Sequence, residues 1–172
     1  DGACIQCTAL VKHFEEPLST FGWTLGAGWG VRLNAPASSN PQVNFGQNVF
    51  GTVGDATSTA ETIDTAIPET LTFRSWNVDA GGADGPGNKT ITIVTSAGDE
   101  VVILDCEGGV NDDSAACLGS TGPRGFDDFD DIELSTGEAA GEVATIVFGY
   151  EADPSGTAQG WFIDDLDAVR CP

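Results

Sequence analysis

The amino-acid sequence predicts an all-β fold, a jelly-roll β-sandwich that forms one domain over residues 1–172 and carries disulfides. Three observations lead to this prediction. Short apolar segments of strand length recur along the chain, turns rich in the 23 glycines separate them, and no convincing amphipathic helix appears. Because no repeat or linker divides its 172 residues, the chain suits a single domain with a sizeable core.

The first half of the chain is expected to begin with a strand that ends on two acids and to continue with two aromatic strands separated by glycines. Turn-forming residues then predict a loop and a glycine-rich turn on either side of a short strand. These elements are, in order, Thr8–Glu16, Ser19–Leu25, Trp29–Leu33, the loop Asn34–Pro41, the strand Val43–Phe45 and the turn Gln47–Asp55.

The middle of the chain predicts two strand pairs. The segment Thr59–Thr65 is expected to pair with Glu69–Val78, which period-two alternation divides into two faces. One face holds Leu71, Phe73 and Ser75, and the other holds Thr72, Arg74 and Trp76. The segments Lys89–Thr95 and Asp99–Cys106 predict a hairpin around Ser96–Gly98.

The last third of the chain predicts an acidic loop, three strands and two isolated helical turns. The loop is Glu107–Leu118, the strands are Gly125–Ser135, Gly141–Tyr150 and Gly160–Arg170, and the turns are Asp112–Leu118 and Gly137–Ala140. In the second of these strands, one face holds Val143, Thr145, Val147 and Gly149.

The closing segment Gly160–Val169 contains two adjacent carboxylates in a strand that is apolar on both faces, which is typical of a strand buried in a sheet. Its apolar residues alternate in two sets, Trp161, Ile163 and Val169, and Phe162, Leu166 and Ala168. Asp164 and Asp165 are therefore expected on opposite faces, at least one of them near the core. Because a buried carboxylate is costly unless it is paired, hydrogen-bonded or bound to a cation, this segment predicts a calcium ion held by one or both aspartates.

The charge of the chain excludes two classes of partner. It has 27 acidic against 6 basic residues and a formal net charge of −21, which repels nucleic acid and anionic lipid and fits a salty medium. Hydrophobic residues make up 40% of the chain, so we do not expect disorder. No apolar run approaches the roughly 20 residues of a membrane-spanning helix. We expect a secreted or cell-surface protein, and a lipid anchor is compatible with that location.

Five cysteines fit disulfides in an exported protein better than a zinc site, because the only Cys-x-x-C, at Cys4 and Cys7, has no second pair. The small acidic loop predicts a bond between Cys106 and Cys117. If the first and last strands are antiparallel neighbours, Cys7 and Cys171 form the natural second bond, which leaves Cys4 over. Alternatively, Cys4 bonds Cys7.

Both ends of the chain resemble a known family of extracellular domains. The stretch from Asp131 to Asp167 has a D-x-E-L-S turn, a glycine, a β-rich run that ends on Tyr150, and then G-W-F-I-D-D-L. The opening has Phe14-Glu15-Glu16 followed by Gly22-Trp23 and Trp29. Together these motifs resemble the bacterial MAM-like, or choice-of-anchor-type, jelly rolls. The cysteine placement differs from that of animal MAM domains, and the middle of the chain is only generically β-like.

This resemblance implies a calcium site where the first and last strands meet. The early glutamate of the family carries over to Glu15 or Glu16, and its late aspartate to Asp164 or Asp165. If Cys7 lies beside Cys171, counting inward along antiparallel strands brings the glutamates near 161–164. The alternative is that these acids cap or hydrogen-bond nearby loop backbone. Calcium is favoured because few bases are present, and Arg32 and Arg170 are the only cations expected nearby.

The function expected from these features is a non-catalytic, calcium-binding module for binding or adhesion at the cell surface, with an extracellular protein or a glycan as partner. Two alternatives remain, a carbohydrate-binding module and an accessory domain of a secreted hydrolase. Trp76 is the aromatic residue most expected to be exposed, and so to contact a ligand. Catalysis is not expected, because the single histidine, His13, has no G-x-S-x-G motif to act with.

Overall fold

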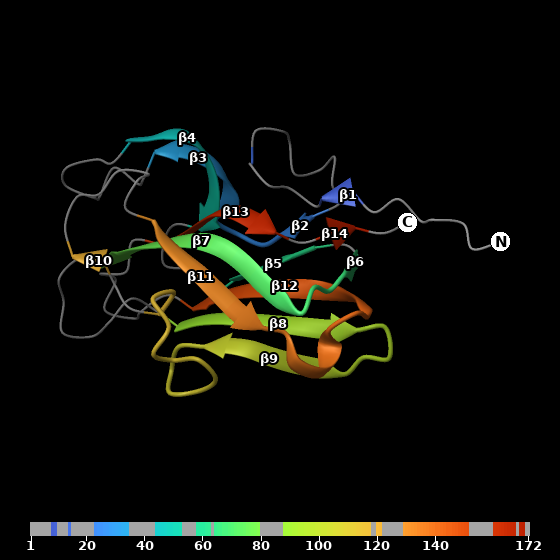
Figure 1. Cartoon of the computed structure of the whole chain (residues 1–172). Coiled ribbons are helices and arrows are strands. Elements are labelled where there is room, and N and C mark those ends of the chain that lie inside the picture. The colour runs from blue at the N-terminus through green and yellow to red at the C-terminus, as the bar shows by residue number, and fades with distance from the viewer. Residues whose placement is uncertain are drawn as a thin grey trace.

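The computed structural model confirms the jelly-roll β-sandwich, in which two sheets enclose a shared hydrophobic core (Figure 1). It describes residues 8–9, 14, 23–34, 44–52, 58–62, 64–79, 88–117, 120–121, 129–151, 160–167 and 169–170. In this part of the chain, every strand pairing is antiparallel except that of β10 with β7.

The first sheet has eight strands and is organised around the nine-residue strand β12. One edge of β12 pairs with β8, which continues to β9, and this pair confirms the predicted hairpin. The other edge pairs with β5 and β6, which lead to β2 and to β14 and β1. The bounds are β1 Thr8–Ala9, β2 Thr24–Leu25, β5 Ser58–Glu61, β6 Thr65–Ala66, β8 Asn88–Thr95, β9 Glu100–Asp105, β12 Val143–Glu151 and β14 Val169–Arg170.

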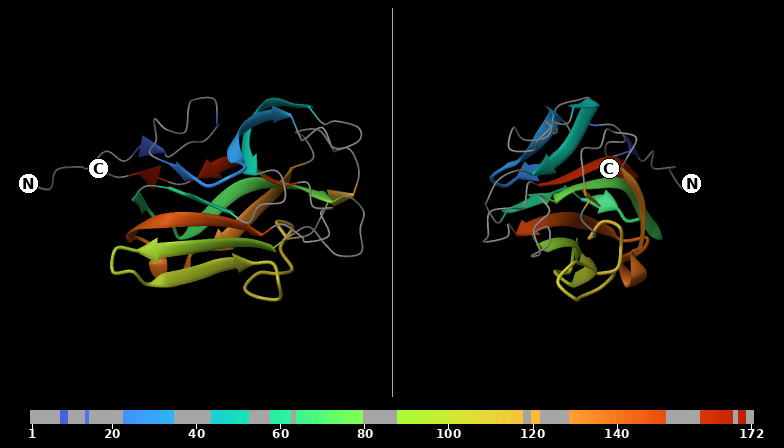
Figure 2. Two further views of the ribbon diagram at one scale, coloured as in Figure 1. Left: turned by 180° about the vertical axis from the view of Figure 1, so that it is seen from behind. Right: turned by 90° about the vertical axis from the view of Figure 1, so that its left-hand side faces the viewer.

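The second sheet has six strands and carries the candidate site. The strands β10 and β11 both pair with β7, which is followed by β13, β4 and β3. The bounds are β3 Trp29–Asn34, β4 Asn44–Thr52, β7 Thr70–Asp79, β10 Ser120–Thr121, β11 Asp130–Ser135 and β13 Trp161–Asp167. A single turn of 3-10 helix, Gly137–Ala139, follows β11 as expected. Figure 2 shows both sheets from behind and from the side.

Aromatic side chains from both sheets fill one part of the core. The ring of Phe50 lies 4.8 Å from that of Trp23, 5.0 Å from that of Trp29 and 5.2 Å from that of Phe14. Trp161 is buried beside them and donates a hydrogen bond from Nε1 to Ser75 Oγ at 2.9 Å. Trp23, Trp29 and Trp161 are therefore core residues, as is usual for aromatic residues in strands.

The prediction of a turn over Gln47–Asp55 is wrong, because β4 continues through Thr52. The glycine that suggested a turn serves a close approach between strands instead. A Cβ atom on Gly51 would lie 2.7 Å from Phe162 Cδ1 and would also overlap the backbone oxygen of Trp161. Glycine is therefore required here by the neighbouring strand β13, with which Gly51 pairs.

The expected pairing of Thr59–Thr65 with Glu69–Val78 is also wrong, although both segments contain strands. The first segment contains β5 and the start of β6, which pair with β12 in the first sheet, whereas β7 lies in the second sheet. An alternating pattern identifies a half-buried strand but not its partner.

The two ends of the chain lie side by side, as predicted: β1 pairs antiparallel with β14, with Thr8 opposite Arg170. The closing segment is nevertheless divided, because β13 belongs to the second sheet and β14 to the first. The disulfide between Cys106 and Cys117 is confirmed. The expected bond between Cys7 and Cys171 lies outside the described residues, as does Cys4.

Candidate functional site

A β-bulge in β13 determines where the two closing aspartates lie. Asp164 pairs with Arg74 and Asp167 with Thr72, so two residues of β13 lie opposite Phe73 alone. Asp165 takes a positive φ of 50° at this bulge, one of only two non-glycine residues to do so in the described parts of the chain. Strict alternation therefore fails: Leu166, expected on the face of Phe162, joins Trp161 and Ile163 in the core.

Asp164 is completely buried on the outer face of the second sheet. Its carboxylate belongs to the same face as Arg74, because residues directly opposite one another in a sheet project to the same side. The nearest basic residue in the register is therefore Arg74, and not Arg32 or Arg170 as the sequence suggested. The reason is that β7, rather than the N-terminal strand, is the neighbour of β13 at this position.

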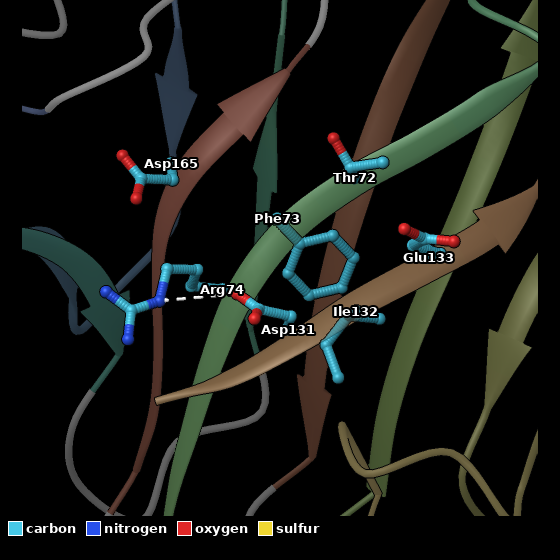
Figure 3. Close-up of a pocket in the computed structure, with 7 residues that line it drawn as sticks. All are labelled: Thr72, Phe73, Arg74, Asp131, Ile132, Glu133 and Asp165. Atoms are coloured by element: carbon cyan, nitrogen blue, oxygen red, sulfur yellow. Dashed lines mark ion pairs between the residues drawn. The ribbon is translucent and has the colours of Figure 1, made fainter. Parts of the chain in front are cut away.

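A cavity of about 310 Å³ lies beside the bulge, on the outer face of the second sheet (Figure 3). Side chains of three adjacent strands line it: Thr72, Phe73 and Arg74 of β7, Asp131, Ile132 and Glu133 of β11, and Asp165 of β13. In Figure 3, Asp165 and Glu133 lie on opposite sides of β7. The lining therefore combines a hydroxyl, a guanidinium and carboxylates above a hydrophobic core.

Contacts with Asp131 and Phe129 help to hold Arg74 in place. Its Nε atom lies 3.5 Å from Asp131 Oδ1, and its Nη2 atom donates a hydrogen bond of 3.4 Å to the carbonyl oxygen of Phe129. The guanidinium carbon also lies 5.8 Å from the centre of the Phe129 ring, a cation–π distance. The side chain of Arg74 is 21% exposed, whereas that of Asp131 is 89% exposed.

The expectation that Trp76 is exposed is wrong, because this residue is only 1% exposed. It lies on the face of Arg74 as predicted, but it stacks on Phe129 with ring centres 6.1 Å apart and packs at a tilt against Phe162 at 5.5 Å. These three buried rings form a second, smaller apolar cluster outside the main core. A buried tryptophan offers no face on which a sugar could stack.

Arg32 lies on β3, two strands away from β13. Its Nη2 atom donates a hydrogen bond of 2.7 Å to the carbonyl oxygen of Gly28, and burial lowers the pKa of its guanidinium. This bond connects Arg32 to the turn just before β3 and so stabilises the start of its own strand. Arg32 is not among the residues that line the cavity.

The predicted calcium ligands are only partly described. Asp164 and Asp165 lie on β13, whereas Glu15 and Glu16 lie outside the described residues. Counting inward along antiparallel strands was expected to bring these glutamates beside 161–164. Strand pairing with Trp161–Ile163 is wrong, because β4 and β7 occupy both edges of β13 there. Among the described residues, no three acidic, histidine or cysteine side chains gather as a metal site.

Four polar lining residues of the cavity were not identified as a site from the sequence: Thr72, Arg74, Asp131 and Glu133. The alternation of β7 correctly placed Thr72 and Arg74 on one face. Nothing in the sequence indicated that β11 pairs with β7 and so brings Asp131 opposite Arg74. The missing information was the strand neighbour rather than the orientation of the side chains.

Comparison with known proteins identifies the fold. No protein-family model and no curated protein sequence matches the chain. A carbohydrate-binding module of family CBM28, specific for non-crystalline cellulose, superposes with a TM-score of 0.56 at 10% identity over 94% of this chain and 93% of that one. The K2 cleaved adhesin domain of Lys-gingipain has a TM-score of 0.51 at 13% identity, over 97% and 98%. The chain therefore has a β-sandwich fold similar to those of carbohydrate-binding modules and adhesin domains.

None of these comparisons tests the resemblance to MAM-like domains, which stays a prediction. No helix in the described residues has the length and apolar character needed to cross a membrane. The Cys106–Cys117 disulfide fits an oxidising, extracellular location.

Proposed function

We propose that this protein is a non-catalytic extracellular module that binds glycans through the cavity on the outer face of its second sheet. Sugar hydroxyls both donate and accept hydrogen bonds, and the lining offers the Thr72 hydroxyl, the Arg74 guanidinium and nearby carboxylates as partners. The fold shared with a cellulose-binding module and with an adhesin domain supports this class of function over nucleic-acid binding, which the net charge of −21 disfavours.

The bulge in β13 is the observation that carries the proposal. Bulges are frequent next to binding and active sites, where they re-aim a side chain. Here the bulge gives Asp165 a φ of 50° and places it in the lining of a cavity that already contains Arg74 and Asp131. A non-glycine residue in this conformation is costly, and its position beside a polar cavity favours a functional reason.

Replacing Asp165 by glycine separates binding from folding. Glycine adopts a positive φ freely, so the melting temperature is expected to change little. Loss of the carboxylate is expected to weaken glycan binding about tenfold or more, which corresponds to one charge-assisted hydrogen bond. Affinity electrophoresis in gels that contain soluble polysaccharides, together with sedimentation with insoluble non-crystalline cellulose, measures the change.

The matched control is Asp64→Gly, which removes an exposed aspartate between β5 and β6 of the first sheet, outside the cavity lining. This variant is expected to bind as the parent protein does. If the parent protein binds no glycan in the panel, or if Asp165→Gly binds as well as Asp64→Gly, the cavity is not the glycan site.

A structural calcium ion near Asp164 is a second proposal, supported by the resemblance to MAM-like jelly rolls. Phe14, the residue before Glu15, stacks on Phe50, whose cross-strand partner Ile163 immediately precedes Asp164. Asp164 is itself a buried carboxylate, which a cation would stabilise. Calcium prefers six to eight oxygen ligands, so it would need backbone oxygens or the glutamates in addition.

Removal of divalent cations with EDTA is expected to lower the melting temperature by several degrees, because an ion that binds only the folded state stabilises it. Differential scanning calorimetry measures the shift, and added Ca²⁺ is expected to restore the original value. Identical melting curves with and without EDTA would count against a structural ion while leaving the glycan proposal intact.

A further inference from the structure

The cavity lining carries more negative than positive charge. Three carboxylates line it, those of Asp131, Glu133 and Asp165, against the single guanidinium of Arg74. The formal charge of the lining is therefore three negative minus one positive, or −2, and the remaining lining residues are uncharged. The chain as a whole carries −21, so charges farther away add to the same negative potential.

The one guanidinium is poorly placed to bind an anion. Its Nε atom faces Asp131 at 3.5 Å, its Nη2 atom donates to the carbonyl oxygen of Phe129, and its flat face lies near the Phe129 ring. Two-pronged recognition of a ligand carboxylate or sulfate uses two parallel N–H groups of a free fork. An acidic sugar would compete with Asp131 and with the carbonyl oxygen of Phe129 for the guanidinium and would still meet Glu133 and Asp165.

A protonated amino group finds suitable acceptors in the same cavity. An ammonium group has three donors and no acceptor. Thr72 and Glu133 lie directly opposite one another on β7 and β11, so the hydroxyl and the carboxylate project to the same side of the sheet. Asp165 contributes a further carboxylate from β13, on the other side of β7 (Figure 3).

We propose that this cavity selects glycans that carry protonated amino groups over neutral glycans, and neutral glycans over those that carry carboxylates or sulfates. The inference rests on the proposed glycan-binding function and adds the substrate class. The ammonium group donates to Glu133, the carboxylate of Asp165 on the other side of β7 adds to the negative potential, and the sugar hydroxyls bond to Thr72 and to the exposed Asp131.

The test compares three soluble oligosaccharides of equal length: the glucosamine tetramer, its fully N-acetylated form and a galacturonic acid tetramer. Isothermal titration calorimetry at pH 6 and low salt is expected to give an affinity for the amino tetramer about tenfold above that for the acetylated form. The acidic tetramer is expected to bind weakest. The amino preference is expected to shrink as salt screens the charges.

A polyanionic protein attracts any oligocation weakly, so the variants decide whether the cavity is responsible. Glu133→Gln is expected to reduce the preference for the amino tetramer severalfold. Its matched control is Glu100→Gln, which changes an exposed strand glutamate on β9, outside the cavity. The same loss in both variants would mean general charge attraction and would overturn the inference.

The remaining outcomes distinguish an error in the proposed charge selection from an error in the proposed glycan-binding function. If the acidic tetramer binds as tightly as the amino tetramer, the charge selection is wrong, while glycan binding stands. If none of the three tetramers binds and the polysaccharide panel is also negative, the proposed function itself is wrong.

Discussion

Replacing Gly51 by alanine is expected to lower the free energy of unfolding by about 3 kcal/mol. The added Cβ would lie 2.7 Å from Phe162 Cδ1 and would overlap the backbone oxygen of Trp161, and neither can move easily. Both neighbours belong to β13 and are completely buried, so the strain would spread to the strand that carries Asp165. Urea denaturation followed by tryptophan fluorescence measures the loss.

The cross-strand partner of Gly51 provides the control. Gly30 lies directly opposite it on β3, and a Cβ there would meet no atom within 4 Å. Gly30→Ala is therefore expected to leave the stability unchanged or to raise it slightly, because alanine restricts the unfolded chain more than glycine does. Equal losses in the two variants would show that glycine is needed in this region for its backbone freedom and not for the approach of β13.

The fold class followed from the sequence because strand length, alternation and turn chemistry are local properties. The two faces of β7, the hairpin of β8 and β9, and the Cys106–Cys117 loop were all predicted from residues that lie close together in the chain. The meeting of the first and last strands, seen as the pairing of β1 with β14, was implied by the resemblance to MAM-like domains and not by a local pattern. The partners of β5 and β7 were not predicted, because many strands of similar pattern compete for each position.

The candidate site was only half predicted for the same reason. Asp165 was singled out from the sequence, but its environment comes from Arg74 and Glu133, which are 91 and 32 residues away in the numbering. The bulge that directs Asp165 into the lining breaks the alternation on which the prediction relied. An extra residue in a strand cannot be seen in a pattern of period two, since it appears only once the neighbouring strand defines the register.

Lys89 shows what alternation does reveal. It lies two and four residues before Ile91 and Ile93, which face the core, and like them it is completely buried. The alternation of β8 puts this lysine on the inward-facing side of the strand, although a lysine is rarely buried unless it is paired. The charge of a lysine favours exposure, whereas its place in the alternation of β8 favours burial. The alternation decides, because a shift by one residue would move Ile91 and Ile93 to the solvent face as well.

Removing the Cys106–Cys117 bridge with the double variant Cys106→Ala/Cys117→Ala is expected to lower the free energy of unfolding by about 3 kcal/mol and the melting temperature by about 10 °C. The bridge closes a loop with a sequence separation of 11, which restricts the unfolded chain. Asn111→Gly is the control, since it keeps a residue that accepts the φ of 57° and loses only the bond from Asn111 Nδ2 to the carbonyl oxygen of Ile103. Calorimetry is expected to show a loss of about 1 kcal/mol for that variant. If both variants lose the same amount, hydrogen bonds rather than the bridge hold the loop against β9.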